Sequence, residues 1–483
     1  MWKIGDMVSI LRKRCYSHIL CISLATAFLI SGCNAPRNAL NKFDTSFQSE
    51  ALGSSNFSRA IKLAQSGISK SKNPKKEDLL WSLQLGSIER LNKNYSQSNE
   101  YFDQSEKMLN FFDYQNKTVD SAAAIATNEN IIPYVGEEYD GIMVNTYKAL
   151  NFMALGDKEL ARVEFNRALE RQKRAVENFA AEIAKLKKEI DKEDAKEDST
   201  VKDNVDNPEI QELIQERYPN LFNFKAYPDF VNPFTTYIAG IFFDLDGDYA
   251  KATTLLKESY GMVSDNDYIG QDFVLTEQVL DGKKDFKNMV WVIFENGMGP
   301  VKEEFRIDVP LFIDKRRDRE RDFKYFGIAL PRLVFRDEAF PYLTIEAEGQ
   351  SYKTQQVANM DRVIQTEFEK DFKGILTRAI ISATSKAVAQ YALSKKGNGK
   401  TQVASLLVAA YSFATTAADV RIWTTLPKNF QVARLPIPEN RLITIKPPGA
   451  ESFQIEIPAC NNSIVYVKIP FRQAKPVYDI ITY

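Results

Sequence analysis

The stretch Ile238-Ala-Gly-Ile-Phe-Phe-Asp-Leu-Asp-Gly-Asp-Tyr-Ala-Lys-Ala252 decides how the first half of the chain folds. Two small residues, Gly240 and Ala252, lie twelve positions apart, and the large apolar Leu256 follows four positions later. Small residues at fixed positions let two helices pack closely, while a large residue fills the groove between neighbouring units. Gly247 suits a tight turn, because glycine tolerates a positive φ. The stretch therefore predicts a helix–turn–helix unit.

Two earlier segments repeat this pattern without gaps. The small, small and large positions are Gly86, Ser98 and Phe102 in the first segment, Ala149, Ala161 and Phe165 in the second, and Gly240, Ala252 and Leu256 in the third. The pattern resembles the tetratricopeptide repeat (TPR) with its A-x3-F spacing. A generic amphipathic helical bundle is the alternative, but three segments in the same register favour repeats. We therefore expect an α-helical TPR-like solenoid over residues 57–265.

The start of the chain indicates where the protein is located. A basic region at residues 12–14 precedes an apolar run, Ile19–Ile30, which has the length of a signal-peptide core and is too short to span a membrane. The run ends in Ile30-Ser-Gly-Cys33, which resembles a bacterial lipoprotein signal-peptidase site. The resemblance implies a signal peptide over 1–32, cleavage between Gly32 and Cys33, and lipidation of Cys33 by fatty acids such as palmitate. An ordinary secretory signal or an uncleaved anchor is the alternative.

The same resemblance implies the compartment. Asn34 follows the cysteine, where an aspartate would favour retention in the inner membrane. We therefore expect a protein held by lipid at the bacterial outer membrane and facing the periplasm. Residues 33–56 form the lipidated N-terminus and tether, with a short helix expected around Phe43–Ala51. Several acyl chains are needed for stable anchoring, and lipoproteins of this type carry three.

The small numbers of histidine and cysteine residues and the low net charge exclude several kinds of chemistry. The single histidine, His18, lies in the predicted signal peptide, so the mature chain lacks Ser-His-Asp and Cys-His catalysis and histidine-based metal sites. With Cys33 lipidated, Cys460 has no intramolecular disulfide partner, and we interpret it as a small buried residue. The formal net charge of −1 leaves no basic excess for nucleic acid. We expect no cofactor and no metal.

Two insertions interrupt the repeats. The run over residues 191–207 is nearly all charged or polar, which is typical of a solvated or disordered segment. Aromatic residues and prolines gather over residues 218–233. We interpret this second stretch as packing that covers an end of the solenoid, with a binding patch as the alternative.

Composition changes in the C-terminal half. β-branched and aromatic runs, such as Met289-Val-Trp-Val-Ile-Phe294, alternate with prolines and turn residues. We expect an antiparallel β-rich domain over 266–483, either a sandwich or a barrel. Two alanine-rich helices, about 360–393 and 401–420, interrupt the strands and predict a soluble helical hairpin packed on the sheet, with a membrane-inserted helix pair as the alternative. The chain as a whole is thus an α+β protein.

Motifs in this half resemble an uncharacterised family of bacterial lipoproteins with an N-terminal repeat region. They are Val290-x-Val-Ile293, Glu295-x-Gly-x-x-Pro-x-Lys302, Ala418-Asp-x-Arg-x-Trp-Thr-Thr-Leu-Pro427 and Gln431-Val-Ala-Arg-x-Pro436. The resemblance implies architecture and compartment and carries no catalytic residue. We interpret Asp419, Arg421 and Trp423 as a cap with a buried ion pair, with a partner contact as the alternative.

These observations favour a binding protein over an enzyme. We expect a membrane-anchored periplasmic scaffold or adaptor that binds a protein or peptide of the cell envelope through its repeats, because solenoids expose extended surfaces. One alternative is a cell-wall-acting hydrolase that uses a carboxylate pair in the C-terminal domain. Another is a structural subunit of an envelope complex. No single carboxylate can be chosen from the sequence, so no catalytic residue is proposed.

Overall fold

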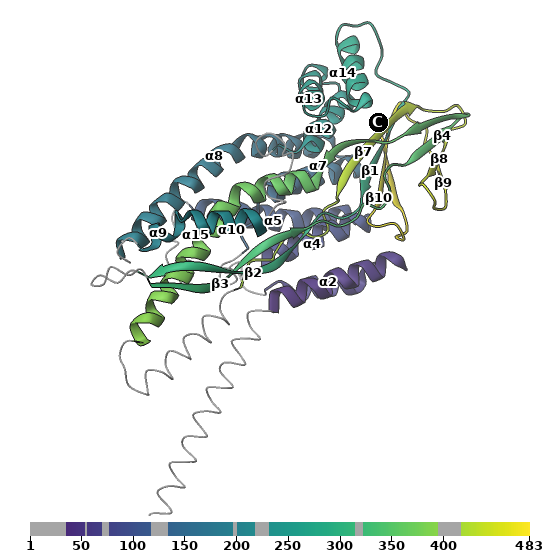
Figure 1. Ribbon diagram of the computed structural model, residues 1–483. Coiled ribbons are helices and arrows are strands. Elements are labelled where there is room, and N and C mark those ends of the chain that lie inside the picture. The colour runs from purple at the N-terminus through teal and green to yellow at the C-terminus, as the bar shows by residue number, and fades with distance from the viewer. Residues whose placement is uncertain are drawn as a thin grey trace, which may run out of the picture.

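The computed structural model describes residues 35–53, 56–69, 77–116, 134–196, 200–217, 231–313, 322–394 and 417–483. The chain is an α+β protein in which helices dominate the first part and strands the second (Figure 1). The signal peptide, Cys33, the aromatic–proline stretch over 218–230 and most of the expected helix 401–420 lie outside the described residues. Residues 417–420 at the end of that expected helix are not helical.

Most helices of the first part pack against the helix that precedes them in the chain. They are α2 (Ala35–Leu52), α3 (Ser58–Gly67), α4 (Asp78–Leu91), α5 (Tyr95–Asn116), α7 (Glu138–Ala154), α8 (Lys158–Lys196), α9 (Thr200–Val205), α10 (Pro208–Arg217), α12 (Pro233–Leu245), α13 (Tyr249–Met262) and α14 (Asp267–Leu280). Contacts join α4 to α5, α5 to α7, α7 to α8, α8 to α12 and α12 to α13.

The small residues of the three repeated segments lie where helices meet. A Cβ added at Gly86 would come within 2.4 Å of the Phe102 ring, and one at Gly240 within 2.9 Å of Leu256. Ser98 donates a hydrogen bond of 2.7 Å to the carbonyl oxygen of Gly86. The corresponding residues of the second segment are fully buried, namely Ala149, Ala161 and Phe165, as is Ala252 of the third.

The turns between these helices have the predicted glycine geometry. Gly156 has φ of 78° and Gly247 has φ of 82°, so both occupy the left-handed region that residues with a Cβ avoid. Asp248 then caps α13 by accepting a hydrogen bond from the backbone of Lys251. The predicted tight turn at Gly247 is therefore confirmed, and Gly156 makes the equivalent turn in the second segment.

We expect Gly86→Ala to lower the free energy of unfolding by about 1–3 kcal/mol, because the added methyl group overlaps the Phe102 ring inside a packed interface. Urea unfolding measures the change. Gly261→Ala in α13 is the matched control, since nothing lies within 4 Å of its added Cβ. The control is expected to change stability by less than about 1 kcal/mol. Equal destabilisation by the two substitutions would contradict the close approach at Gly86.

The strands form three sheets. Their bounds are β1 (Met289–Asn296), β2 (Val301–Ile313), β3 (Asp322–Val334), β4 (Thr344–Ala347), β5 (Gln350–Lys353), β6 (Gln355–Asn359), β7 (Asn429–Pro436), β8 (Leu442–Lys446), β9 (Phe453–Glu456), β10 (Asn462–Ile469) and β11 (Val477–Thr482). The five-stranded sheet has the order β11-β10-β1-β7-β6, the four-stranded sheet β5-β4-β8-β9, and β2 pairs with β3 in a long hairpin. The helix α15 (Met360–Ser394) lies between the two groups of strands in the sequence.

The sheets correct the expectation of a purely antiparallel sandwich or barrel. In the central pair β1 runs parallel to β10, from Met289 opposite Asn462 to Asn296 opposite Ile469. Parallel neighbours need a long crossover, and here almost the whole C-terminal part of the chain lies between the two strands. Among the described residues no sheet closes into a barrel. Strand β11 was not predicted from the sequence.

Three further expectations about boundaries were wrong. The short helix expected around Phe43–Ala51 within the tether over 33–56 is present but begins earlier, at Ala35, because Leu40, Phe43 and Phe47 form an apolar stripe that is buried. Residues 267–280, assigned to the β-rich domain, form the helix α14, which packs on α13. The charged segment 191–207 is helical over most of its described length, and Asn204 and Val205 are buried.

One continuous core joins the helical and strand-rich parts. It contains Leu83 and Ile88 of α4 as well as Val290 and Ile293 of β1. Cys460, expected to be buried, is only partly so, because it lies in the loop before β10. The two halves therefore pack as one unit, and the contacts between them shape the site described below.

A buried carboxyl group in this core gives the protein a predicted pH dependence. Asp244 of α12 is 1% exposed and accepts a hydrogen bond of 2.6 Å from Thr276. Burial raises its pKa from 3.8 to about 8, and nearby Asp272 adds to the rise. The native state therefore keeps a proton that the unfolded chain has already released above pH of about 4.

We expect the free energy of unfolding to fall as pH rises from about 4 to 8, by up to about 1.4 kcal/mol per pH unit from this group. Asp244→Asn should flatten that slope, since the amide does not titrate. Urea unfolding of both proteins across this pH range measures the difference between the two slopes. Titratable groups that the two proteins share contribute equally to both slopes and cancel in the difference. Parallel profiles for the two proteins would show that Asp244 is ionised in the native state.

Candidate functional site

A segment from the C-terminal part fills the surface of the first repeated helix pair. Trp423 is 1% exposed and its ring lies 5.8 Å from that of Phe102 and 6.0 Å from that of Tyr147, measured between centroids. Its indole nitrogen donates to the hydroxyl groups of Ser87 and Thr425 at 3.0 and 2.9 Å. The ring thus packs between helices α4, α5 and α7 in the way a bound peptide side chain would.

Polar contacts fix the rest of this segment on α4. The Gln84 side chain donates to Thr424 Oγ1 at 3.0 Å and accepts from Thr425 Oγ1 at 2.8 Å. Arg421 is 2% exposed and forms ion pairs of 2.7 Å with Asp419 and 3.3 Å with Glu77. Arg421 and Trp423 are thus buried structural contacts, as expected, whereas Asp419 in the ion pair is 28% exposed. The helix end that these residues were expected to cap lies outside the described residues. This part of the repeat surface is therefore covered by the chain itself and is closed to an external peptide.

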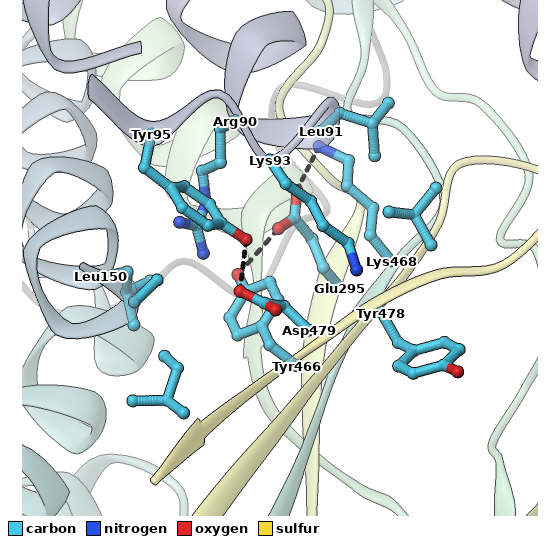
Figure 2. A pocket seen from close by; sticks show the side chains of 13 residues that line it. Arg90, Leu91, Lys93, Tyr95, Leu150, Glu295, Tyr466, Lys468, Tyr478 and Asp479 are labelled. Carbon is cyan, nitrogen blue, oxygen red and sulfur yellow. Dashed lines mark hydrogen bonds and ion pairs between the residues drawn. The ribbon is translucent and has the colours of Figure 1, made fainter. Parts of the chain in front are cut away.

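An open pocket lies beside this contact, where the repeat helices meet the five-stranded sheet (Figure 2). We call it the junction pocket. It has an empty volume of about 410 Å³ with its open mouth included. Its walls are Arg90, Leu91, Lys93, Tyr95, Leu150, Ala154, Glu295, Tyr466, Lys468, Val477, Tyr478, Asp479 and Ile481. These residues come from α4, α5, α7, β1, β10 and β11, so the pocket exists only when both parts of the chain are assembled.

Glu295 forms the charged base of the junction pocket. It is 1% exposed and lies 2.5 Å from Lys468 Nζ. The hydroxyl groups of Tyr466 and Tyr147 donate to its two oxygens at 2.7 and 3.0 Å. Burial alone would raise the pKa of Glu295, but the charges of Lys468 and Arg90 bring it below its ordinary value. The carboxylate is therefore ionised and fully engaged.

Arg90 lies above this base among tyrosine rings. Its guanidinium carbon is 4.8 Å from the Tyr466 ring centroid, 5.3 Å from that of Tyr147 and 5.9 Å from that of Tyr95. One of its terminal nitrogens donates to the Asn151 side chain at 2.6 Å. A cation held against aromatic faces keeps its charge with little mobility. Arg90 thus offers a fixed positive charge to the pocket.

The mouth of the pocket carries charges of both signs (Figure 2). Tyr95 donates a hydrogen bond of 2.5 Å to Asp479. The Lys93 ammonium lies 5.4 Å from the Tyr478 ring centroid, and the lysine is exposed. Lys93 lies in the tight turn between α4 and α5, with φ of 63°, at the rim of the pocket.

The pocket is therefore amphipathic and carries an excess positive charge. Arg90, Lys93 and Lys468 face only two carboxylates, those of Glu295 and Asp479. Apolar walls from α4, α7 and β11 and tyrosine rings surround them. Such a site suits an anionic group attached to an apolar or peptide body. Glu295 is ionised and so cannot donate a proton as a general acid, which limits acid–base chemistry here.

The residues predicted from the repeat pattern do not line this pocket. Gly86, Ser98 and Phe102 lie in the helix interfaces, as do their counterparts in the later segments. Sequence reasoning missed Arg90 and Lys468 because single charged residues in a helix and a strand carry no local signal. Of these three residues only Glu295 was indicated by the sequence, because it directly follows an apolar run, where a charged side chain is unusual.

Comparison of the sequence with family models, with curated proteins and with solved structures finds no match. The site must therefore be interpreted from its own chemistry. Among the described helices none is both long and apolar enough to cross a membrane.

Proposed function

We propose that the chain is a lipid-anchored binding protein of the bacterial cell envelope that holds an anionic group of an envelope protein or peptide in the junction pocket. The observation that carries the proposal is the combination of Arg90, Lys93 and Lys468 with only two carboxylates on aromatic and apolar walls. Lys468 and Arg90 hold Glu295 ionised, so this residue cannot serve as a general acid, which favours binding over acid catalysis at this site.

We also infer that the pairs α4–α5, α7–α8 and α12–α13 are TPR-like repeats of a short solenoid. The common spacing of small and large residues supports this inference, together with the close approaches at Gly86 and Gly240. In this proposal the solenoid acts as a frame for the pocket, because the Trp423 segment already covers α4. A sandwich of the two larger sheets stays a prediction.

The anchor is tested by labelling cells with a palmitate analogue. We expect the wild-type protein to be labelled and to fractionate with the outer membrane. Cys33→Ala should lose both properties, because the cysteine is the proposed acceptor of lipid. A Cys33→Ala protein that still carries the label would exclude this lipidation site, and fractionation of the wild type with the inner membrane would exclude the proposed location.

The binding role is tested by crosslinking in intact cells followed by pull-down of the full chain. We expect one stoichiometric envelope protein, with recovery reduced at least tenfold by Lys93→Glu, because charge reversal at the rim repels an anionic group. Lys283→Glu is the matched control, since Lys283 is exposed and lies outside the pocket. Equal recovery with both variants would rule out the pocket as the binding site.

A hydrolase acting on the cell wall is the second candidate, because Glu295 and Asp479 lie in one pocket. It requires one of the two carboxyl groups to be protonated when substrate is bound. Release of soluble wall fragments by the purified protein, abolished by Asp479→Asn, would favour this function over binding.

A further inference from the structure

The two outer strands of the five-stranded sheet, β6 and β11, differ in what lies beside them. At β6 the carbonyl groups of Gln355 and Gln356 accept hydrogen bonds of 3.3 and 3.0 Å from the side chain of Asn266, which caps α14. The chain thus covers that edge itself. Beyond β11, by contrast, no strand lies within the part of the chain that the structure describes. An outer strand without a neighbour is a template for another strand.

The pairing register shows which backbone groups of β11 point outward. Tyr483 and Asn462 exchange two backbone hydrogen bonds, of 2.9 and 3.1 Å, so they form a hydrogen-bonded pair. Such pairs alternate along antiparallel strands. The N–H and C=O groups of Tyr478, Ile480 and Thr482 therefore point away from β10. Among the described residues no hydrogen bond from outside the sheet reaches these groups.

Strand β11 lacks the features that protect a bare edge. Its sequence, Val477-Tyr-Asp-Ile-Ile-Thr482, contains no proline and no lysine, and its pairing with β10 has no bulge. β-branched and aromatic residues dominate it, and these favour strand pairing. Its one charged side chain, Asp479, is bonded to Tyr95. The edge is therefore suited to pairing with a strand from outside.

The edge borders the junction pocket, which indicates what kind of strand it fits. Tyr478 and Asp479 line the pocket, and Lys93 Nζ lies 5.4 Å from the Tyr478 ring centroid (Figure 2). A residue opposite Tyr478 on an added strand would have its Cβ about 4.5–5.5 Å from that of Tyr478, on the same face of the sheet. Its side chain would come close to the Lys93 ammonium group, whose charge a carboxylate would complement.

We propose that an extended segment of a partner protein binds as a sixth strand along β11 and presents its acidic group to the junction pocket. Main-chain hydrogen bonds to Tyr478, Ile480 and Thr482 would supply affinity, and the pocket would supply selectivity. This inference rests on the proposed function and names the form in which the anionic group is bound.

The test is fluorescence anisotropy with short labelled peptides and the purified full chain. The first peptide, capped at both ends, alternates threonine and valine around a central glutamate. The second has glutamine in place of glutamate, and the third is the first with every backbone nitrogen methylated. We expect a Kd of about 300 μM or tighter for the first peptide. Binding should be at least fivefold weaker for the second, which lacks the charge, and at least tenfold weaker for the third, which lacks backbone donors.

Substitutions in the protein test the same contact from the other side. Ile480→Pro removes an outward N–H group while the hydrogen bonds to β10 remain, so it should weaken binding of the glutamate peptide at least tenfold. Ser351→Pro is the matched control, since Ser351 is exposed on β5, an outer strand of the four-stranded sheet, and should not change binding. Lys93→Glu should weaken binding of the glutamate peptide and not that of the glutamine peptide. Circular dichroism verifies that each variant is folded.

The proposal is overturned by an absence of saturable binding up to about 1 mM peptide. It is also overturned if the methylated peptide binds as well as the first, a result that does not depend on how Ile480→Pro folds. A dimer of the full chain that Ile480→Pro dissociates would equally overturn it, because a second copy would then occupy the edge. Equal affinity for the glutamate and glutamine peptides, both lost in Ile480→Pro, would support the added strand and contradict the proposed function.

Discussion

Replacing Trp423 with alanine is expected to lower the free energy of unfolding by about 3–5 kcal/mol. The indole is 1% exposed and fills the space between Phe102 and Tyr147, where no neighbouring side chain can collapse without opening the repeat interface. Its removal also leaves the hydroxyl group of Ser87 without its donor. Urea unfolding followed by circular dichroism measures the loss.

The size of this effect must be separated from the general cost of removing an aromatic ring. Tyr325→Ala in β3 is the control, because Tyr325 is 66% exposed and should change stability by less than about 0.5 kcal/mol. Trp423→Phe keeps an apolar ring but loses the N–H donor, so an intermediate effect is expected. If Trp423→Ala were no worse than Tyr325→Ala, the contact between the repeats and the C-terminal segment would not stabilise the protein.

Replacing Glu295 with glutamine is expected to cost about 3–5 kcal/mol, although the side chain keeps its shape. The change leaves Lys468 at the base of the pocket, and Arg90 above it, without the counter-charge of Glu295. Two tyrosine hydroxyl groups also lose a charged acceptor. Urea unfolding again measures the loss, and the expected effect is large because water cannot replace the lost charge.

Glu346→Gln provides the matched comparison. Glu346 pairs with Lys446 at 2.5 Å, as closely as Glu295 pairs with Lys468, but its side chain is 42% exposed. Exposed pairs contribute little, so a change below about 0.5 kcal/mol is expected. If Glu295→Gln cost no more free energy of unfolding than Glu346→Gln, solvent would reach Glu295, and the base of the pocket would not be a buried charge cluster.

Local patterns predicted much of the secondary structure. The spacing of Gly240, Ala252 and Leu256 indicated a helix pair with a glycine turn. Helices that pack closely need small residues at their contact, and this requirement is visible in the sequence. The apolar run at Met289–Phe294 likewise identified β1. A short helix around Phe43–Ala51 was also predicted, but its start at Ala35 was missed because the residues before Asn41 are mostly polar.

The assembly of these elements could not be predicted. Trp423 stands more than 300 positions after Phe102, and nothing local indicates that their rings meet. The parallel pairing of β1 with β10 likewise depends on how the long segment of chain between the two strands folds, and neither strand carries a local signal for it. Glu295, Arg90 and Lys468 form a site only because three separate elements converge, so their chemistry is a property of the fold.

The central claim is that an envelope partner occupies the junction pocket. A photo-reactive amino acid placed at position 93, at the rim of the pocket, tests it most directly in living cells. We predict a covalent adduct with one envelope protein at position 93, and none when the same probe replaces the exposed Lys283. The absence of an adduct at position 93, or the same adducts at both positions, would contradict the claim.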